Sequence, residues 1–197
     1  MKPDDIIYEQ IGQSLESFQL AAEQLDDLLH HGAELLTQAL LSDGKILVCG
    51  MGSSAANGQG FVTRMLSRFE LERPGLPALA LSGDGLLLTG ISHDTNPNDI
   101  YARQIRTLGH ATDVLLTLST TGNAPPVIKA IQAAHEMGMR VVALTGGGGG
   151  DIATLLEDND VELRVAADKS GLIQLTHHLL LNCLGELIEH QLFGSEL

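Results

Sequence analysis

Two short turns rich in glycine and hydroxyl residues are the features of the sequence best suited to chemistry. Residues 50–56 read GMGSSAA and include Ser54, and residues 119–126 read STTGNAPP. Small residues at the start of a helix let backbone N–H groups and hydroxyls approach a phosphate. A tight turn before an ordinary helix has the same composition, so each turn alone is compatible with both interpretations.

Five apolar runs indicate the strands that position these turns. They cover residues 45–50, 76–82, 113–119, 139–146 and 161–166, each bounded by Gly, Asp or Pro. Runs that are apolar on both faces favour a parallel sheet covered by helices on both sides, which is an α/β fold. Ligands of open α/β sheets bind beyond the carboxyl ends of the strands, where both turns are expected.

Two helical segments flank this region. Apolar residues recur at steps of three and four from Ile7 to Leu29, which predicts a long amphipathic helix. We expect a second helix over residues 33–41, ended by Gly44. Residues 172–193 are apolar nearly all round, as in a helix buried on more than one side. The apolar face of the helix from Ile7 to Leu29 must pack on its own subunit, on a partner subunit, or on both.

Length and charge restrict the functional class. The 197 residues are interpreted as one domain, with a helical segment (1–43) before an α/β core and C-terminal helix (44–197). The 11 basic and 25 acidic residues give a net charge of −14, which argues against direct nucleic-acid binding. The sequence contains no signal-peptide pattern, no long apolar span and no Cys-x-x-Cys pair, so we predict a cytoplasmic protein without a membrane segment.

The turns GMGSS and STTGN together resemble the signature of the SIS (sugar isomerase) domain family. Four further stretches are similar to its phosphoheptose isomerase branch: ERPGLPALALS (72–82), NDIYARQIRTLGHATDVLL (98–116), VIKAIQAAHEMGMRVVALTG (127–146) and IQLTHHLLLNCLGELIEHQLF (173–193). The resemblance implies a single SIS domain with a five-stranded parallel sheet between helices, and a homotetramer. The branch includes D-sedoheptulose 7-phosphate isomerase and a non-catalytic relative, the DnaA initiator-associating protein.

The resemblance also implies a sugar-phosphate site. Its residues here are Ser54, Ser119, Thr120, Thr121, Asp94 and Gln174, with Asp94 expected in a loop after the second strand. Met51 replaces a family Asn and Ala124 replaces a family Ser. We therefore expect a site suited to phosphate but with fewer contacts for the sugar.

The isomerases of the branch hold a zinc ion between two helices. A His and a Glu four residues apart face a Gln and a His eight residues apart, and the matching positions here are Gly60, Arg64, Gln174 and Asn182. Only the Gln is kept, and the Glu that also acts as acid/base has become a cation, which disfavours zinc. We therefore predict no metal, no cofactor and no catalytic residue. A relocated acid/base centre at His93, His177 or His178 is the alternative.

Two further features complete the sequence-based expectations. The glycine run 146–150 lacks the Gly-Lys-Ser/Thr ending of a nucleotide loop and is expected to be a flexible connection. Leu192 and Phe193 form an apolar pair near the end of the chain. In the non-catalytic relative such a pair is implicated in DnaA contact, and simple packing is the alternative.

The sequence thus favours a non-catalytic homotetramer that binds the replication initiator DnaA and promotes its assembly at the origin, with a residual phosphosugar site. The alternative is D-sedoheptulose 7-phosphate isomerase, which feeds the heptose of lipopolysaccharide. A sugar-phosphate sensor is a third interpretation.

Overall fold

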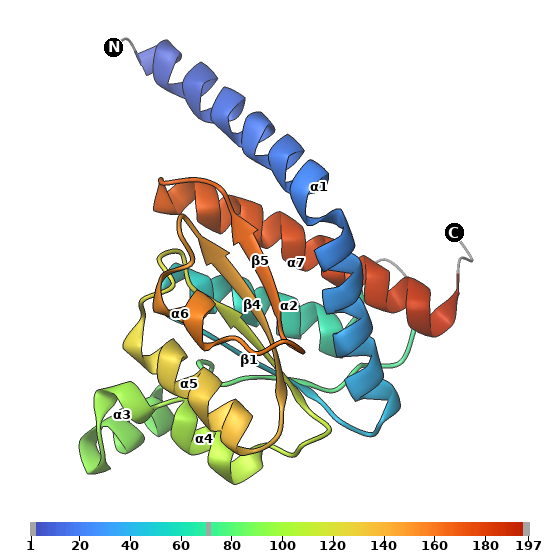
Figure 1. Cartoon of the computed structure of the whole chain (residues 1–197), viewed down its shortest axis with the longest axis vertical. Coiled ribbons are helices and arrows are strands. Elements are labelled where there is room, and N and C mark those ends of the chain that lie inside the picture. Colours follow the sequence, from blue (N-terminus) through green and yellow to red (C-terminus); the bar gives the residue numbers. More distant parts are fainter. Residues whose placement is uncertain (1–2, 70–71, 195–197) are drawn as a thin grey trace.

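Five parallel strands form one sheet in the order β2-β1-β3-β4-β5 (Figure 1). The computed structural model describes residues 3–69 and 72–194. The strands are β1 (Ile46–Gly50), β2 (Ala78–Ala80), β3 (Val114–Leu118), β4 (Arg140–Gly146) and β5 (Val161–Val165). The α-helices are α1 (Pro3–Leu41), α2 (Ser53–Leu66), α3 (Gly85–Asp94), α4 (Ala102–Leu108), α5 (Pro125–Glu136), α6 (Gly150–Leu155) and α7 (Ser170–Phe193). The predicted α/β class and the five strands are confirmed.

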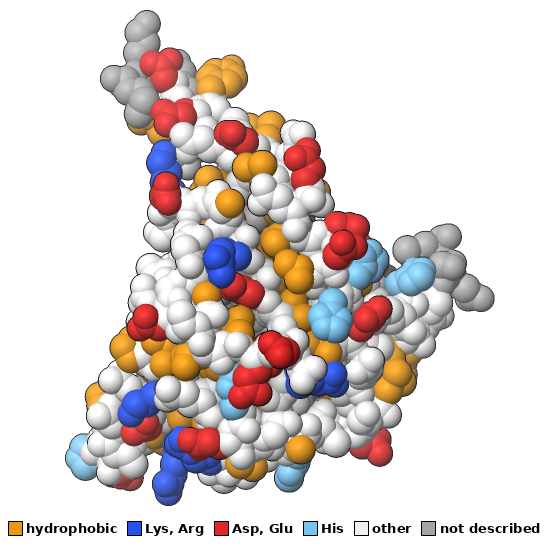
Figure 2. Space-filling view, in the orientation of Figure 1, with side chains coloured by type: hydrophobic (Ala, Val, Ile, Leu, Met, Phe, Trp, Pro, Cys, Tyr) orange, Lys and Arg blue, Asp and Glu red, His pale blue; other side chains and the backbone are white. Residues whose placement is uncertain are grey.

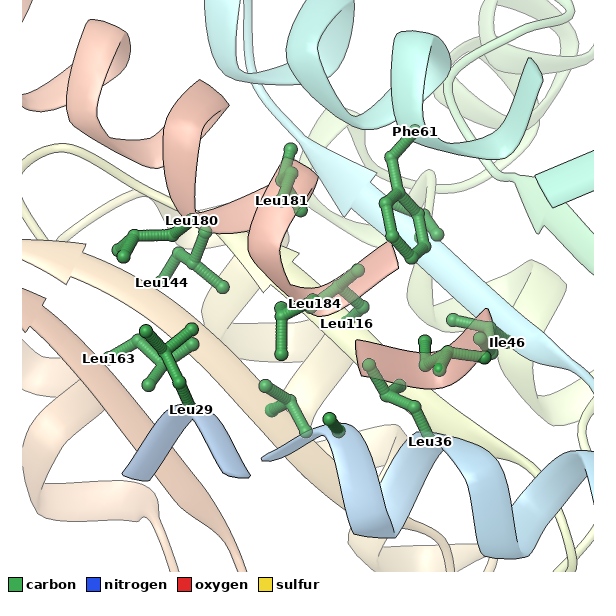
Figure 3. Close-up of a cluster of buried hydrophobic side chains, with 14 of the residues drawn as sticks. Leu29, Leu36, Ile46, Phe61, Leu116, Leu144, Leu163, Leu180, Leu181 and Leu184 are labelled. Carbon is green, nitrogen blue, oxygen red and sulfur yellow. The ribbon is translucent and has the colours of Figure 1, made fainter. Parts of the chain in front are cut away.

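Helices cover both faces of the sheet. One apolar cluster joins α1, α2 and α7 to the strands, and a second joins α4, α5 and α6 to the opposite face. Figure 3 shows the first cluster, in which Leu29 and Leu36 of α1 lie near Leu180 and Leu184 of α7 above the strands. Both faces of the central strands are therefore buried from solvent, which explains their continuous apolar sequences.

The sheet register brings the two hydroxyl-rich turns to the same edge. β1 pairs directly with β3, and Gly50 lies opposite Leu118 at the ends of these strands. The turn after β1 begins at residue 51 and the turn after β3 begins at residue 119. They are therefore neighbours at the carboxyl edge of the sheet, as the sequence predicts.

The N-terminal segment differs from the expectation of two helices. α1 is continuous from Pro3 to Leu41, so the predicted boundary before residue 33 is wrong. Gly32 lies against Leu184, Val142 and Val161, whose side chains are 3.6 to 3.7 Å from the point where a Cβ would be. Packing against α7 and the sheet thus carries the helix through a residue of low helix propensity.

Only the second half of α1 packs on its own subunit. Leu25 and Leu29 are 5 % and 8 % exposed, whereas Ile7, Ile11 and Leu15 are 58 %, 54 % and 62 % exposed. The first half projects from the rest of the molecule (Figure 1). In Figure 2 acidic side chains follow this projection, with apolar side chains between them. The apolar stripe predicted from the sequence is therefore divided between the core and solvent.

Within the described ranges, no helix combines the length and apolar character needed to cross a membrane.

Candidate functional site

The turn after β1 is built around the close approach of Gly50 to its neighbours. A Cβ on Gly50 would lie 3.0 Å from the Leu118 carbonyl oxygen and 3.0 Å from the Ser54 side chain, so the position has no room for a larger residue. The Tyr101 hydroxyl, buried on the other side, donates a 2.6 Å hydrogen bond to the Gly50 carbonyl. Tyr101 was not predicted from the sequence, and it fixes the strand end from which α2 begins.

Ser54 lies in the first turn of α2 and is buried. The residue before this helix, Gly52, has a φ of +57° and offers no side chain to cap the helix. The first N–H groups of a helix have no partners within it and carry a partial positive charge. In α2 the Ser54 and Ala56 N–H groups already donate to the Met51 and Gly52 carbonyls, so the features suited to an anion here are the Ser54 hydroxyl and the positive end of the helix dipole.

The turn after β3 presents hydroxyls that are already oriented. The Ser119 hydroxyl oxygen accepts a 3.1 Å hydrogen bond from the Gly122 N–H, and the Thr121 hydroxyl oxygen accepts a 3.3 Å bond from the Asn123 N–H. Each hydroxyl is held as an acceptor, so its own proton can be donated outward. Ser119 is buried, Thr120 is half-buried and Thr121 is exposed. These groups form a donor set beside the start of α5.

The glycine run 146–150 is packed against this turn, so the expectation of a flexible connection is wrong. A Cβ on Gly122 would lie 1.8 Å from the Gly149 carbonyl oxygen, and Gly122 itself has a φ of +67°. The Asn123 side-chain oxygen accepts a 2.9 Å hydrogen bond from the Asp151 N–H. Glycine is needed here because two backbones touch, and the run packs directly against the turn after β3.

Two helices, α2 and α7, extend the site away from the turns. The Asn57 side-chain amide donates a 2.8 Å hydrogen bond to the Gln174 carbonyl. Seven residues further along α2, the Arg64 guanidinium donates a hydrogen bond to the side-chain oxygen of Asn182. The same guanidinium lies 4.0 Å above the centre of the Phe69 ring, a cation–π contact. Asn57 and Phe69 were not identified from the sequence.

A buried ion pair fixes the segment that carries Phe69. Glu189 of α7 accepts a 2.8 Å hydrogen bond from Arg73 and a 3.0 Å bond from the Phe69 N–H. Both charged side chains are almost fully buried. Arg73 also donates to the carbonyls of Arg64 and Met65 at the end of α2. The interactions form a closed ring that holds Arg64 in place.

The residues at the family's zinc positions do not fit a metal ion. Gly60 has no side chain, Arg64 is a cation, and Asn182 accepts a hydrogen bond from that cation. Across residues 3–69 and 72–194, no group of three or more His, Cys, Asp and Glu side chains is arranged to hold a metal. Zinc prefers thiolate, imidazole and carboxylate ligands. The place between α2 and α7 is instead occupied by an arginine–asparagine contact.

The histidines proposed as alternative acid/base groups lie in different environments. His177 is fully buried, and its Nε2 donates a 2.9 Å hydrogen bond to the Thr145 carbonyl. Its Nδ1 finds no hydrogen-bond partner among residues 3–69 and 72–194, and burial lowers the pKa of the imidazole to about 4. His178 is exposed on α7. A neutral, enclosed imidazole such as His177 is suited to a structural role.

Asp94 lies at the end of α3, outside the two turns. It is the last residue of α3 and not part of a loop, because Asp84 caps a regular helix from Gly85 onward. Its exposed carboxylate lies 2.9 Å from the His93 ring. It lines a separate furrow with Ile91 and Arg103. These contacts place Asp94 with α3 and α4.

The C-terminal pair lies at the end of α7. Leu192 is half-buried against the apolar cluster under α1, while Phe193 is 42 % exposed. Just before them, Gln191 accepts a 2.6 Å hydrogen bond from Thr37 of α1. The pair therefore combines one anchored residue with one that faces solvent.

The segments that form the candidate site contain basic but no acidic side chains of their own. Residues 50–69, 119–129 and 169–185 contain no Asp or Glu but include Arg64, Arg68, Lys129 and Lys169. These segments are the two turns with the helices that follow them, and the first part of α7. Arg68, Lys129 and Lys169 form ion pairs with Glu72, Asp99 and Glu9 of neighbouring segments, which compensate much of this positive charge.

The comparisons with known proteins agree on one protein family. The SIS domain family model matches residues 8–146. The chain is 49 % identical over 184 residues to the DnaA initiator-associating protein DiaA of Klebsiella pneumoniae, covering 93 % of this chain and 94 % of that protein. It is 45 % identical over 195 residues to the phosphoheptose isomerase of Alkalilimnicola ehrlichii, covering 99 % and 100 %.

Two solved structures of phosphoheptose isomerases are also similar to this chain. The phosphoheptose isomerase GmhA of Neisseria gonorrhoeae superposes with a TM-score of 0.90 at 39 % identity, covering 95 % of this chain and 99 % of that one. A phosphoheptose isomerase from Francisella tularensis gives a TM-score of 0.93 at 36 % identity, covering 96 % and 100 %.

Proposed function

This chain belongs to the SIS domain family, and we propose that it is a non-catalytic member that binds the replication initiator DnaA and promotes its assembly at the origin. In this proposal the two turns retain a phosphosugar site at Ser54, Ser119, Thr120 and Thr121, next to Gln174 of α7. The protein acts in the cytoplasm as a homotetramer. The relative named DiaA, at 49 % identity, supports the choice of partner.

The contact between Arg64 and Asn182 carries the non-catalytic part of the proposal. Isomerisation of a ketose to an aldose moves a proton between adjacent carbons, which requires a positioned base and a group that polarises the carbonyl. At the position of the family's acid/base residue stands a guanidinium, which cannot accept a proton near neutral pH. The contacts that run from Arg64 through Phe69 to Glu189 hold this guanidinium in position. The position therefore presents a cation where isomerisation would need a carboxylate base.

The tetramer is supported by apolar surface left uncovered in one subunit. Ile7, Ile11 and Leu15 line the projecting half of α1. A groove of about 440 Å³ lies between α1 and α7, with Phe18, Leu179 and Leu187 in its walls. Exposed apolar surface of this kind marks an interaction site. A second copy that covers both features would present several equivalent DnaA contacts, and multivalency strengthens weak contacts.

The second candidate function is D-sedoheptulose 7-phosphate isomerase. It is favoured by the relative named phosphoheptose isomerase at 45 % identity and by the two superposed isomerase structures. In this candidate an acid/base group other than the one at position 64 performs the proton transfer.

An activity assay separates the two candidates. Purified full-length protein is incubated with sedoheptulose 7-phosphate in the presence of zinc, and the aldose product is measured. We expect no turnover above that of a buffer control. Turnover that Gln174→Ala abolishes, while the exposed control Leu175→Ala retains it, would establish the isomerase and overturn the non-catalytic proposal.

A further inference from the structure

We propose that Tyr101 is a positioning residue of the phosphosugar site, because its buried hydroxyl holds the strand end from which the turn with Ser54 begins. Tyr101 acts through this turn and does not touch the ligand. The inference rests on the proposed phosphosugar site at the two turns, and it adds a residue that sets the affinity of this site for a phosphate group.

The Tyr101 side chain reaches the first turn from the start of α4. It is 2 % exposed and belongs to the apolar cluster under α4 and α5. Its hydroxyl donates a 2.6 Å hydrogen bond to the carbonyl of Gly50, the last residue of β1, and lies 3.5 Å from the Met51 sulfur. Burial raises the pKa of this hydroxyl, so it keeps its proton and remains a donor at neutral pH.

The position of Ser54 depends on the strand end that Tyr101 holds. A Cβ on Gly50 would lie 3.0 Å from the Ser54 side chain, so the two residues are packed closely. The Ser54 N–H donates a 3.1 Å hydrogen bond to the carbonyl of Met51, the residue directly after Gly50. A displacement of the Gly50 carbonyl is therefore passed on to the Ser54 hydroxyl through one peptide unit and one hydrogen bond.

The segment that carries Tyr101 is itself fixed to other elements around the turns. The buried side-chain amide of Gln104 donates a 2.9 Å hydrogen bond to the Leu81 carbonyl, just after β2. Lys129 of α5, the helix that follows the second turn, donates a 2.7 Å hydrogen bond to Asp99. The segment therefore connects the end of β1 with the end of β2 and with α5, and Tyr101 makes the connection to β1.

A turn that is held in its binding geometry loses less conformational freedom when a ligand binds, which raises affinity. The hydroxyl of Tyr101 supplies this restraint, while its ring supplies packing in the apolar cluster. The two contributions are separable, because phenylalanine keeps the ring and lacks the hydroxyl. The inference concerns the hydroxyl alone.

Calorimetric titration of the full-length protein with sedoheptulose 7-phosphate in phosphate-free buffer tests the inference. We expect Tyr101→Phe to weaken binding about three- to ten-fold, the scale of one hydrogen bond. In a Ser54→Ala background the same substitution should have little further effect, because Tyr101 acts through Ser54. In a Ser119→Ala background, which alters the other turn, it should keep its full effect.

Thr37→Val is the matched control, since Thr37 is also buried and its hydroxyl donates a 2.6 Å hydrogen bond to Gln191, between α1 and α7. It should lower the melting temperature and leave the affinity for the sugar phosphate unchanged.

Two results would overturn the inference alone. In the first, Tyr101→Phe lowers the melting temperature as Thr37→Val does but leaves the affinity unchanged. In the second, the full effect of Tyr101→Phe persists in the Ser54→Ala background. If the wild type does not bind sedoheptulose 7-phosphate, the phosphosugar part of the proposed function fails together with the inference.

Discussion

Arg64 and Asn182, which are 118 residues apart in the sequence, are joined by a hydrogen bond between their side chains. The bond links α2 to α7 at the place where the isomerases of the family are expected to hold zinc. A metal crosslink and a hydrogen bond supported by a cation–π contact both tie the two helices together. The bond therefore ties α2 to α7 through two side chains that are poor zinc ligands.

Arg64→Ala should destabilise the protein by about 1 to 3 kcal/mol, because it removes a hydrogen bond from a charged donor and a cation–π contact. Arg68→Ala is the control and should change stability by less than about 0.5 kcal/mol, since its pair with Glu72 is exposed. Thermal denaturation at a fixed protein concentration measures both. Equal melting temperatures for the two variants would show that the Arg64 contacts carry no stability.

His177 should make stability fall as the pH falls. Burial lowers its pKa from 6.5 to about 4, so between these values the unfolded chain binds a proton that the folded chain does not. The stability contributed by the neutral imidazole is complete above pH 6.5 and is lost on acidification towards pH 4. Between pH 7.5 and pH 5 this amounts to about 2 kcal/mol.

The pH effect is checked with paired leucine variants. His177→Leu should remove about 2 kcal/mol of the difference in unfolding free energy between pH 7.5 and pH 5, whatever its effect at neutral pH. His178→Leu, at an exposed neighbouring position, should leave the difference unchanged. An identical pH dependence in wild type and His177→Leu would refute the assignment.

Leu15→Glu should dissociate the proposed tetramer without unfolding the subunit, since Leu15 is 62 % exposed in the single chain. A carboxylate buried without a partner at an interface costs several kcal/mol. Light scattering at micromolar concentration should give a tetramer mass for the wild type and a smaller mass for the variant. Gln24→Glu, at an exposed position on the opposite side of α1 from Leu15, is the control that should remain tetrameric. A monomeric wild type would contradict the assembly.

Much of the fold follows from the sequence. The five runs correspond to β1 to β5. The three central strands are covered on both faces and leave a continuous apolar pattern, whereas the edge strands β2 and β5 are only partly buried. The continuity of α1 was missed because Gly32 favours a helix end locally, while its helical state depends on Leu184 and Val142 from distant elements. Local propensity does not contain this information.

The candidate site was only partly predictable for the same reason. Ser54, Ser119 and Thr121 are found from turn composition and strand order. Phe69 is not, because its role depends on the Arg64 side chain and on space left by Gly185. Repeated glycine in residues 146–150 is typical of a segment with high backbone freedom. The sequence does not reveal that the backbone of Gly122 packs against this segment.

The most direct test of the proposed function is a calorimetric titration of the tetramer with purified DnaA, using the wild type and a double variant. We predict that the wild type binds and that Leu192→Ala with Phe193→Ala weakens binding by at least about 1 to 2 kcal/mol, the usual scale for an interface anchor, while the tetramer mass is unchanged. Unchanged affinity in the double variant would assign Leu192 and Phe193 to packing alone. Absence of any binding by the wild type would contradict the adaptor function.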